Sequence, residues 1–480
     1  MNQRDIIYKV EQASNRYGIP EILGLKGKFL KKYIEDVIDT NVDGRNSGVF
    51  PREGYYRYSS FLVKSLLYFI VTIITIFREK KYVKMVKYPA KSFNKFVYVA
   101  GAYKIVKAQK IREILPETSV YYFPISNLSF IGNHIQSFND KDIPLIIDTF
   151  KAKHILKTFK IFVTNYRTLK LFSRSVDEIY GTDYNDVIVV LLKTIYFVNH
   201  YNDYVQLLTQ DRHIWLLEFH SGMEMLALQN ALKEKRPHDV TVHMQHGTML
   251  EHTYPEFHHP VTDYDIVCGE REVRILSDLN KYDSKLIGIG CPLQSLGYIK
   301  ESPVELIQYD VLVLLTATNF TSTLDYQVKV LKKLSEMKNV KVRLRYRPAS
   351  KKADQRNLES YTVGMTTSEG TSLDEDISRS NVVISFSADA MYSCFRQGRR
   401  MILVVLDKSI EDEFNKCNID SANLRSMTEN AFEPSILEQM IANRDMVDYT
   451  KDSYVKYNFG SIDTVSYKKQ IKAFLDSITC

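Results

Sequence analysis

The chain has 480 residues, of which 45% are hydrophobic and 25% charged, and this composition excludes an intrinsically disordered protein. The length exceeds what one core normally supports, so two or three domains are expected. The formal net charge of +7 is too mild for the dense basic stripe of a nucleic-acid-binding protein, and no nucleic-acid partner is expected.

The five cysteines are widely spaced, and no Cys-x-x-Cys motif occurs. This pattern predicts reduced thiols and a cytoplasmic protein. The first residues, MNQRDIIYKVEQ, lack the apolar stretch of a signal peptide, which agrees with that location.

Residues 1–90 predict a helical, basic N-terminal extension. Within it, Leu66–Phe77 reads LLYFIVTIITIF and has basic residues on both sides. Twelve mostly apolar residues are too few to span a bilayer, which needs about 20. Two interpretations remain open: a buried helix or strand, and a helix that lies on a membrane surface. The second would place the protein at the inner face of the plasma membrane.

A strand–helix–strand pattern follows, with strands at Lys95–Ala100 and Val120–Phe123 around a helix at Tyr103–Leu115. The stretch Leu145–Leu208 is mostly helical in pattern.

The next strand–helix–strand unit has a clearer sequence pattern. Strands are expected at Ile214–Phe219 and Val240–Met244, with a helix over Met223–Lys235 between them. A parallel crossover of this kind would bring His220 and His246 to the same edge of the sheet.

The remaining pattern continues to alternate between strands and helices. The expected strands share apolar runs bounded by turns, and they are Tyr264–Gly269, Lys285–Gly290, Tyr309–Leu315, Val340–Pro348, Asn381–Ser385 and Met401–Leu406. The expected helices are the stretch from Glu270 to Leu279, Leu324–Met337, a short one capped by Ser372–Glu375, Asp389–Gln397 and Tyr467–Ile478.

This alternation predicts an α/β fold with two doubly wound, Rossmann-type halves facing a cleft. The expected domains are the extension at 1–90, an N-terminal half at 91–291 and a C-terminal half at 292–480 with a closing C-terminal helix. Ligands are expected at the carboxyl ends of the strands.

Eight of the eleven histidines lie between His213 and His259. Among them, His246 follows a strand in a Gln-His-Gly turn, and a histidine there suits proton transfer or substrate orientation. A packed or surface role is the alternative. Its neighbours Gln245, Gly247 and Thr248, together with His220, are candidate substrate-binding residues.

A metal site is not expected. His243 and His246 differ by three positions, so they point to opposite faces if the strand continues, and Cys268 completes no zinc pattern.

Two glutamates are further candidates for a general base. Glu218 ends a strand and Glu270 begins a helix, both near the expected ligand edge. For Glu270, the alternative is a first-turn acid that interacts with the helix dipole.

Three arginines, Arg343, Arg345 and Arg347, alternate along one strand, so their side chains share a face. Guanidinium groups suit a diphosphate, and a solvated strand face is the alternative. Arg347 and Pro348 fall at the carboxyl end of the strand, whereas Arg343 is expected at the surface.

The turn Ser385-Phe-Ser-Ala-Asp389 joins a strand to a helix, where free N–H groups and hydroxyls form an anion site. N-capping by Ser387 is the alternative. Asp389 would act on the helix dipole. Thr318 lies in a similar polar turn, after Tyr309–Leu315.

Several of these segments resemble the GT-B glycosyltransferases, and more narrowly the bacterial surface- and capsular-polysaccharide transferases. The likeness rests on Val242-His-Met-Gln-His-Gly247, Tyr264-Asp-Ile-Val-Cys-Gly-Glu270, Ile287-Gly-Ile-Gly-Cys-Pro292, Arg345-Tyr-Arg-Pro348 and Val383-Ile-Ser-Phe-Ser-Ala-Asp389. It covers roughly residues 95–410. Polysialyltransferases and CDP-glycerol glycerophosphotransferases are more loosely similar.

The resemblance implies a nucleotide-sugar donor in the C-terminal half and a glycan or lipid-linked glycan acceptor in the N-terminal half. Arg347-Pro348 stands where the relatives have His-Pro, and Ser385-Phe-Ser387 replaces an adjacent serine pair. The donor site would comprise Arg345, Arg347, Pro348, Thr318, Ser385, Ser387, Ala388 and Asp389. No cofactor or divalent metal is expected.

The implied activity is transfer of a sugar to a surface polysaccharide, with His246, Glu218 or Glu270 as the base. Alternatives are a CDP-alditol phosphotransferase, a nucleotide-sugar epimerase and a non-catalytic assembly protein.

Overall fold

The computed structural model describes residues 3–38, 60–86, 93–100, 105–122, 143, 145–180, 187–208, 212–218, 222–245, 261–279, 284–290, 307–316, 321–347, 351–387, 390–406, 408–416, 423–450 and 452–479.

The chain divides into two compact units. The N-terminal unit comprises Met1–Met244, Tyr254–Asp265 and Leu279–Lys285, and the C-terminal unit comprises Gln245–Thr253, Ile266–Asp278 and Leu286–Cys480. The sequence places a boundary near residue 291, whereas the contacts group Ile266–Asp278 with the C-terminal unit.

One sheet has seven strands in the order β3-β2-β1-β4-β5-β6-β7, and the other has six in the order β10-β9-β8-β11-β12-β13. The pairs of β1 with β2 and β4, of β2 with β3 and of β4 with β5 are parallel, as are all pairs of the six-stranded sheet. The strands are β1 Phe96–Ala100, β2 Ser119–Tyr122, β3 Leu145–Ile147, β4 Ile214–Leu217, β5 Val240–Met244, β6 Tyr264–Val267, β7 Lys285–Gly288, β8 Tyr309–Leu314, β9 Val342–Arg345, β10 Thr366–Thr367, β11 Ser380–Ser385, β12 Arg400–Val405 and β13 Leu424–Thr428.

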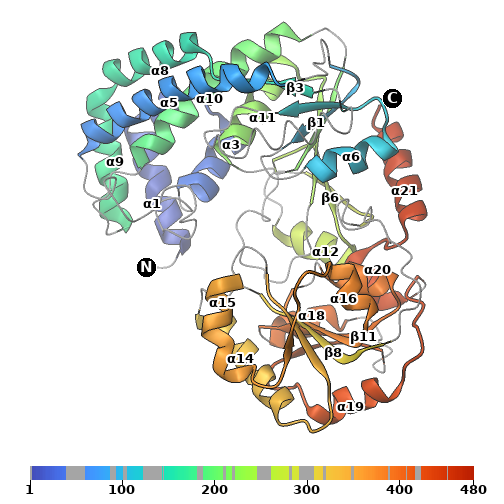
Figure 1. Ribbon diagram of the computed structural model, residues 1–480. Helices are drawn as coiled ribbons and strands as arrows, with labels where there is room; N and C mark the ends of the chain where they lie inside the picture. Colours follow the sequence, from blue (N-terminus) through green and yellow to red (C-terminus); the bar gives the residue numbers. More distant parts are fainter. Residues whose placement is uncertain are drawn as a thin grey trace. The chain divides into compact units, whose positions relative to one another are not determined.

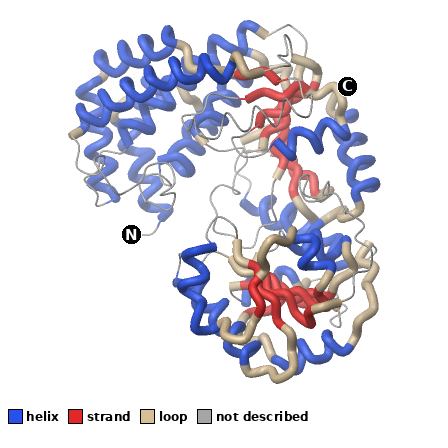
Figure 2. The backbone as a smooth tube through the Cα atoms, viewed as in Figure 1, coloured by secondary structure: helices blue, strands red, loops and turns tan. Residues whose placement is uncertain are grey.

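Helices accompany both sheets (Figures 1 and 2). Central strands such as β4, β11 and β12 are buried at every position, which explains their continuous apolar runs. The predicted α/β fold with two doubly wound parallel halves and a helical N-terminal extension is therefore confirmed.

The helical segments of the N-terminal unit are α1 Gln3–Arg16, α2 Ile19–Leu23, α3 Gly27–Lys32, the π-helix η1 Tyr33–Ile38, α5 Phe61–Val83, α6 Ile105–Ile114, α8 Ala152–Thr164, α9 Tyr166–Tyr180, α10 Val187–Tyr204, the 3₁₀ turn η2 Val205–Leu207 and α11 Met223–Lys235. The extension is not separate from the sheet domain. Val10, Leu23 and Tyr33 belong to the same apolar core as Leu191 and Trp215.

α5 extends well beyond the apolar run that the sequence marks. It packs against α8 and α10, and the three helices lie together in Figure 1. None of the helices that the structure describes is long and apolar enough to cross a membrane.

The helical segments of the C-terminal unit are α12 Glu270–Leu279, of which Glu270–Asp278 belong to this unit, α14 Thr321–Ser335, α15 Lys351–Leu358, the 3₁₀ turn η3 Glu359–Tyr361, α16 Leu373–Ser378, α17 Met391–Arg396, α18 Lys408–Phe414, α19 Pro434–Ala442, α20 Ser453–Phe459 and α21 Thr464–Ser477. The predicted capping box is present: the Glu375 N–H donates to Ser372 Oγ, and the Ser372 N–H donates to Glu375 Oε2 at 2.7 Å.

Two glycines allow an unusually close backbone approach in the C-terminal unit. A Cβ added at Gly269 would lie 2.3 Å from the Tyr457 carbonyl oxygen. A Cβ at Gly460, whose φ is +67°, would lie 2.2 Å from the Cys268 carbonyl oxygen. The turn before α12 therefore packs directly on the end of α20.

Candidate functional site

The first candidate position is the point of the seven-stranded sheet where the strand order reverses, between β1 and β4. Ligands of open α/β sheets bind outside the carboxyl ends of the strands at such a point. Glu218 follows β4 directly and is buried. Tyr98 of β1 is paired with Leu216 in the register, and its hydroxyl lies 3.5 Å from Glu218 Oε2. The structure therefore places one predicted acid at the expected edge.

The Tyr98 hydroxyl is the donor in this contact, which at 3.5 Å is a long hydrogen bond. Burial, and then the charge and hydrogen bond of Glu218, raise the pKa of Tyr98 well above its usual value. The phenol consequently keeps its proton at physiological pH and presents it to Glu218.

The second candidate position is the corresponding reversal in the six-stranded sheet, between β8 and β11. Ser385 is the last residue of β11, and its hydroxyl donates to the Ser387 carbonyl at 2.6 Å. The same oxygen accepts the Ser387 N–H at 3.1 Å. This compact turn, residues 385–387, is held on β8 by a hydrogen bond from the Phe386 N–H to the Leu314 carbonyl at 3.2 Å.

The alternative of N-capping by Ser387 is wrong. α17 begins at Met391, its N-cap is Ala390, and no side chain caps it. The predicted helix begins two residues too early. Ser387 is half-buried at the end of the turn.

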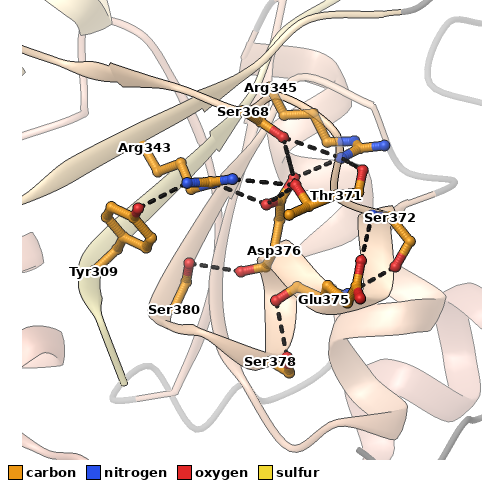
Figure 3. A network of polar contacts seen from close by, with 10 residues as sticks. All are labelled: Tyr309, Arg343, Arg345, Ser368, Thr371, Ser372, Glu375, Asp376, Ser378 and Ser380. Carbon is orange, nitrogen blue, oxygen red and sulfur yellow. Dashed lines mark hydrogen bonds and ion pairs between the residues drawn. The ribbon is translucent and has the colours of Figure 1, made fainter. Parts of the chain in front are cut away.

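Two of the three arginines share one carboxylate, that of Asp376 (Figure 3). Arg343 Nε lies 2.8 Å from Asp376 Oδ1, and Arg345 Nη1 lies 2.5 Å from Oδ2. Arg343 also donates to the Tyr309 hydroxyl at 2.7 Å. The expectation that Arg343 lies at the surface is wrong, because its side chain is 8% exposed and pairs with a fully buried acid.

Asp376 organises this network within the C-terminal unit. Burial alone would raise the pKa of Asp376, but hydrogen bonds from Ser368, Thr371 and Arg345 and the charge of Arg343 outweigh burial and lower it. The carboxylate is therefore ionised, and it pairs with two guanidinium groups, which leaves one net positive charge in the network.

One guanidinium nitrogen of Arg345, Nη1, is bound within this network. Its Nη1 donates to the Ser368 hydroxyl and to the Thr371 carbonyl at 3.0 Å, besides Asp376. Its predicted phosphate contact stays a prediction. Arg347 lies two residues beyond the end of β9 and is exposed, because the strand ends earlier than the sequence suggests.

The sequence did not identify Asp376 as a partner of these arginines. The capping box beside it was recognised, but Asp376 lies 33 residues from Arg343 and follows no motif. The sequence offers only an acidic residue in a short helix after two alternating arginines, and nothing in it marks that acid as buried.

A third polar cluster lies at the carboxyl end of β3. The Tyr121 hydroxyl donates to Asp148 Oδ2 at 2.6 Å, and His200 Nε2 contacts the same oxygen. The His154 ring stands edge-on to His200, with centroids 5.1 Å apart. Burial, followed by the effect of His200, lowers the pKa of His154 to about 4.

A cavity of about 710 Å³ adjoins this cluster. Its lining combines apolar side chains with a cationic edge, and it comprises Ile76, Val83, Lys84, Thr149, Phe150, Lys151, Ala152, Lys153, His154, His200, Asp203, Tyr204 and Leu207. No sequence motif predicts this cavity, because its walls come from segments that are far apart in the sequence: α5, α8 and the end of α10.

The described members of the histidine-rich segment have structural partners. His243 Nδ1 lies 2.6 Å from Asp265 Oδ1, and His213 lies beside Asp239, which also accepts a 2.8 Å hydrogen bond from Arg236 Nε. Both His213 and His243 are buried, so these pairs have a structural role.

Eight predicted site residues lie outside the described residues: His220, His246, Gly247, Thr248, Thr318, Pro348, Ala388 and Asp389. Of the others, Gln245 is buried, and its N–H donates to the Ile266 carbonyl at 3.0 Å. Glu270 is the first residue of α12 and exposed, which is the geometry of the first-turn alternative.

Among the residues that the structure describes, no group of three or more His, Cys, Asp or Glu side chains is arranged to hold a metal ion. Metal-independent chemistry stays a prediction.

No family model matches the sequence, and no curated protein matches it. Similar solved structures include the UDP-GlcNAc 2-epimerase of Methanocaldococcus jannaschii, at 11% identity and a TM-score of 0.47 over 79% of this chain and 99% of that one. A putative UDP-N-acetylglucosamine 2-epimerase of Listeria monocytogenes has 12% identity and a TM-score of 0.47 over 80% and 96%.

The pneumococcal O-GlcNAc transferase GtfA, solved with UDP and GlcNAc, has 11% identity and a TM-score of 0.40 over 60% of each chain. The similar structures thus include both epimerases and a transferase. At 11–12% identity this likeness is one of fold and does not assign a reaction to this chain.

Proposed function

We propose that this protein is a glycosyltransferase that uses a nucleotide-activated sugar. The observation that carries the proposal is the Ser385–Ser387 turn at the strand-order reversal of the C-terminal sheet. The Ser385 hydroxyl shapes this turn through its bonds to Ser387, and the half-buried Ser387 hydroxyl would be the group that contacts a nucleotide phosphate. Arg347, exposed just beyond β9, which is the second strand from β11 in the sheet, would supply the positive charge that a leaving diphosphate needs.

The N-terminal unit would bind the acceptor. Glu218 is the described candidate for the base that deprotonates the acceptor hydroxyl, with Tyr98 as its hydrogen-bond donor. His246, which follows β5 in the sequence, remains the second candidate for this role.

The finer proposal is that the acceptor is a growing surface or capsular glycan, free or lipid-linked, at the inner face of the plasma membrane. Its support is the resemblance of the sequence motifs to polysaccharide transferases.

Calorimetric titration of the full chain with UDP, CDP, GDP and CMP tests the donor site. Binding of at least one nucleotide is expected, and Arg347→Ala should weaken it by about tenfold or more. Lys338→Ala is the matched control, because Lys338 is exposed between α14 and β9, at the opposite edge of the same sheet. If no nucleotide binds, the enzyme proposal fails and an assembly role replaces it.

The protein is then incubated with a sugar donor that carries the nucleotide found to bind. Analysis of the products distinguishes sugar transfer, epimerisation and phosphoalditol transfer. Sugar attached to an acceptor glycan supports transfer. A changed sugar still attached to the nucleotide identifies an epimerase, and transfer of a phosphoalditol identifies the CDP-alditol alternative.

A further inference from the structure

Helix α5 buries several polar side chains on its packed side. Lys64, Ser65, Thr72 and Thr75 have exposed fractions of 6% or less, and they are buried together with Phe61, Tyr68 and Phe69. The three hydroxyls of Ser65, Thr72 and Thr75 donate to backbone carbonyls one turn earlier in the helix, for example Ser65 Oγ to Phe61 O at 2.7 Å. Such back-bonding satisfies the hydroxyls on the packed side without any partner helix.

The opposite face of α5 is apolar and exposed. Eight large side chains, each at least 44% exposed, form it: Leu62, Val63, Leu66, Ile70, Val71, Ile73, Ile74 and Phe77. Soluble monomers rarely expose a continuous apolar area of this kind, and one usually marks a contact surface.

Helix α8 extends this apolar face. It packs beside α5 (Figure 1). The rings of Phe69 and Phe159 lie 5.2 Å apart. On α8, Leu156, Phe159 and Val163 are exposed and share one side of the helix, at spacings of three and four residues. The two helices therefore present one apolar surface.

A row of lysines borders that surface. Lys153, Lys157 and Lys160 are exposed and follow one another at spacings of four and three along α8. At 100° per residue, this row stands next to the apolar side of the helix. An apolar face edged by lysines is the pattern of a helix that lies in the interface of an anionic bilayer.

A cavity of about 710 Å³ is lined in part by the same two helices, α5 and α8. Ile76 and Val83 of α5 and Lys153 of α8 contribute to its lining, together with Lys84 and Lys151. Apolar walls with lysines at the edge suit an acyl chain below a phosphate headgroup.

We propose that the exposed apolar face of α5 and α8 docks the protein on an anionic lipid bilayer. The helices would lie in the plane of the surface, with their apolar side chains below the headgroups and the α8 lysines at the level of the lipid phosphates. This inference does not depend on the proposed transfer reaction.

Co-flotation of the full chain with vesicles tests it, using phosphatidylcholine alone and phosphatidylcholine with 30% phosphatidylglycerol. Binding to the anionic vesicles is expected, at least tenfold stronger than to the neutral ones, and 0.5 M salt should reduce it. The double variant Ile70→Glu, Ile74→Glu should lower binding by more than tenfold. The control Val363→Glu changes an exposed valine of the C-terminal unit and should bind like the wild type.

The lysines are tested with Lys157→Glu, Lys160→Glu, which should lose the preference for anionic vesicles. The control Lys338→Glu, Lys352→Glu makes the same change of charge on exposed residues of the C-terminal unit, and this variant should keep the preference for anionic vesicles. Fluorescence of the single tryptophan, Trp215, which is buried in the N-terminal unit, confirms that this unit is folded in each variant.

Either of two results overturns the proposal: wild-type protein that does not float with anionic vesicles, or an Ile70→Glu, Ile74→Glu variant that is folded and floats unchanged. A wild-type dimer that this variant dissociates, without vesicle binding, would assign the face to a second copy of the chain instead.

Discussion

Arg343 and Asp376 form a buried ion pair in which Arg343 Nε lies 2.8 Å from Asp376 Oδ1. The same carboxylate also pairs with Arg345, so one acid contacts two arginines of one strand. Arg343 and Arg345 are thus tied to Asp376, whereas Arg347, the third arginine of the alternating row, is exposed.

Replacement of this acid should destabilise the C-terminal unit. Asp376→Asn leaves the buried Arg343 guanidinium without its counter-charge, and breaking a buried pair in this way costs about 3–5 kcal/mol. Urea unfolding followed by far-UV circular dichroism measures the loss. Asp412→Asn is the control, since Asp412 pairs with Lys408 on the surface, and such pairs contribute about 0–1 kcal/mol. A loss equal to that of the control would show that Asp376 does not hold the arginines in solution.

Acid should weaken the same network. The pKa of Asp376 is lower in the folded than in the unfolded chain, so its stabilising contribution is complete above the usual aspartate pKa of about 3.9. The contribution is lost as the pH falls from there through the lower folded pKa. The difference in unfolding free energy between wild type and Asp376→Asn should therefore shrink below about pH 4. A difference that stays constant to pH 2 contradicts the assignment.

Glu218 should be required for catalysis. Glu218→Gln removes the base while keeping the shape of the side chain, and loss of a general base lowers kcat by about 10²–10⁴. Trp215 lies on the adjoining strand β4, so its fluorescence checks the fold of this region. Glu270→Gln, in the first turn of α12, should stay within about threefold of the wild type. The reverse pattern, with activity lost only in Glu270→Gln, would move the role to Glu270.

The N-terminal unit should lose stability at mildly acidic pH through His154. Its pKa is about 4 in the folded protein and about 6.5 when unfolded, so the unfolded chain binds more protons between those values. The unfolding free energy should fall as the pH drops from 6.5 to 4, by at most about 1.4 kcal/mol per pH unit from this group. His154→Gln should flatten that slope in unfolding curves followed by Trp215 fluorescence. His238→Gln, at a half-exposed histidine, should not change it; equal slopes for wild type and His154→Gln would refute the prediction.

The close backbone contact at Gly269 should not tolerate a side chain. Gly269→Ala places a Cβ 2.3 Å from the Tyr457 carbonyl oxygen, which forces the turn away from α20 and costs about 1–3 kcal/mol or more. Gly364→Asn is the control, because a Cβ there meets nothing within 4 Å and asparagine accepts the positive φ of that site. Hydrogen exchange of α20 amides reports the change, and unchanged exchange in Gly269→Ala would contradict it.

Elements with a strong local pattern were predictable from the sequence. Helix α11 and strand β5 have the predicted bounds, and the capping box of Ser372 and Glu375 is present. Their signals are apolar periodicity and cap chemistry within a few residues. Strands β3 and β10, of three and two residues, were missed because they are too short to carry such a pattern.

Partnerships between distant residues were not predictable in the same way. Asp376 with Arg343 and Asp148 with His200 are set by how the elements pack, over 33 and 52 residues of chain. The apolar run around Leu66–Phe77 illustrates the same limit. The sequence left open whether this run is a buried helix or strand, or a helix that lies on a membrane surface. In the structure, one face of the helix is buried and the other is exposed.

The packing of Gly269 against Tyr457 also bears on how the protein can be divided. Ile266–Asp278 belong to the C-terminal unit, although Leu279–Lys285 return to the N-terminal one. No single cut in the chain therefore releases either unit intact, and a fragment starting at residue 292 would lack the surface on which α20 rests. Truncated versions that begin or end at the predicted boundary near residue 291 are expected to aggregate or to be degraded during expression. Functional dissection of this enzyme candidate should accordingly rely on point variants of the whole chain.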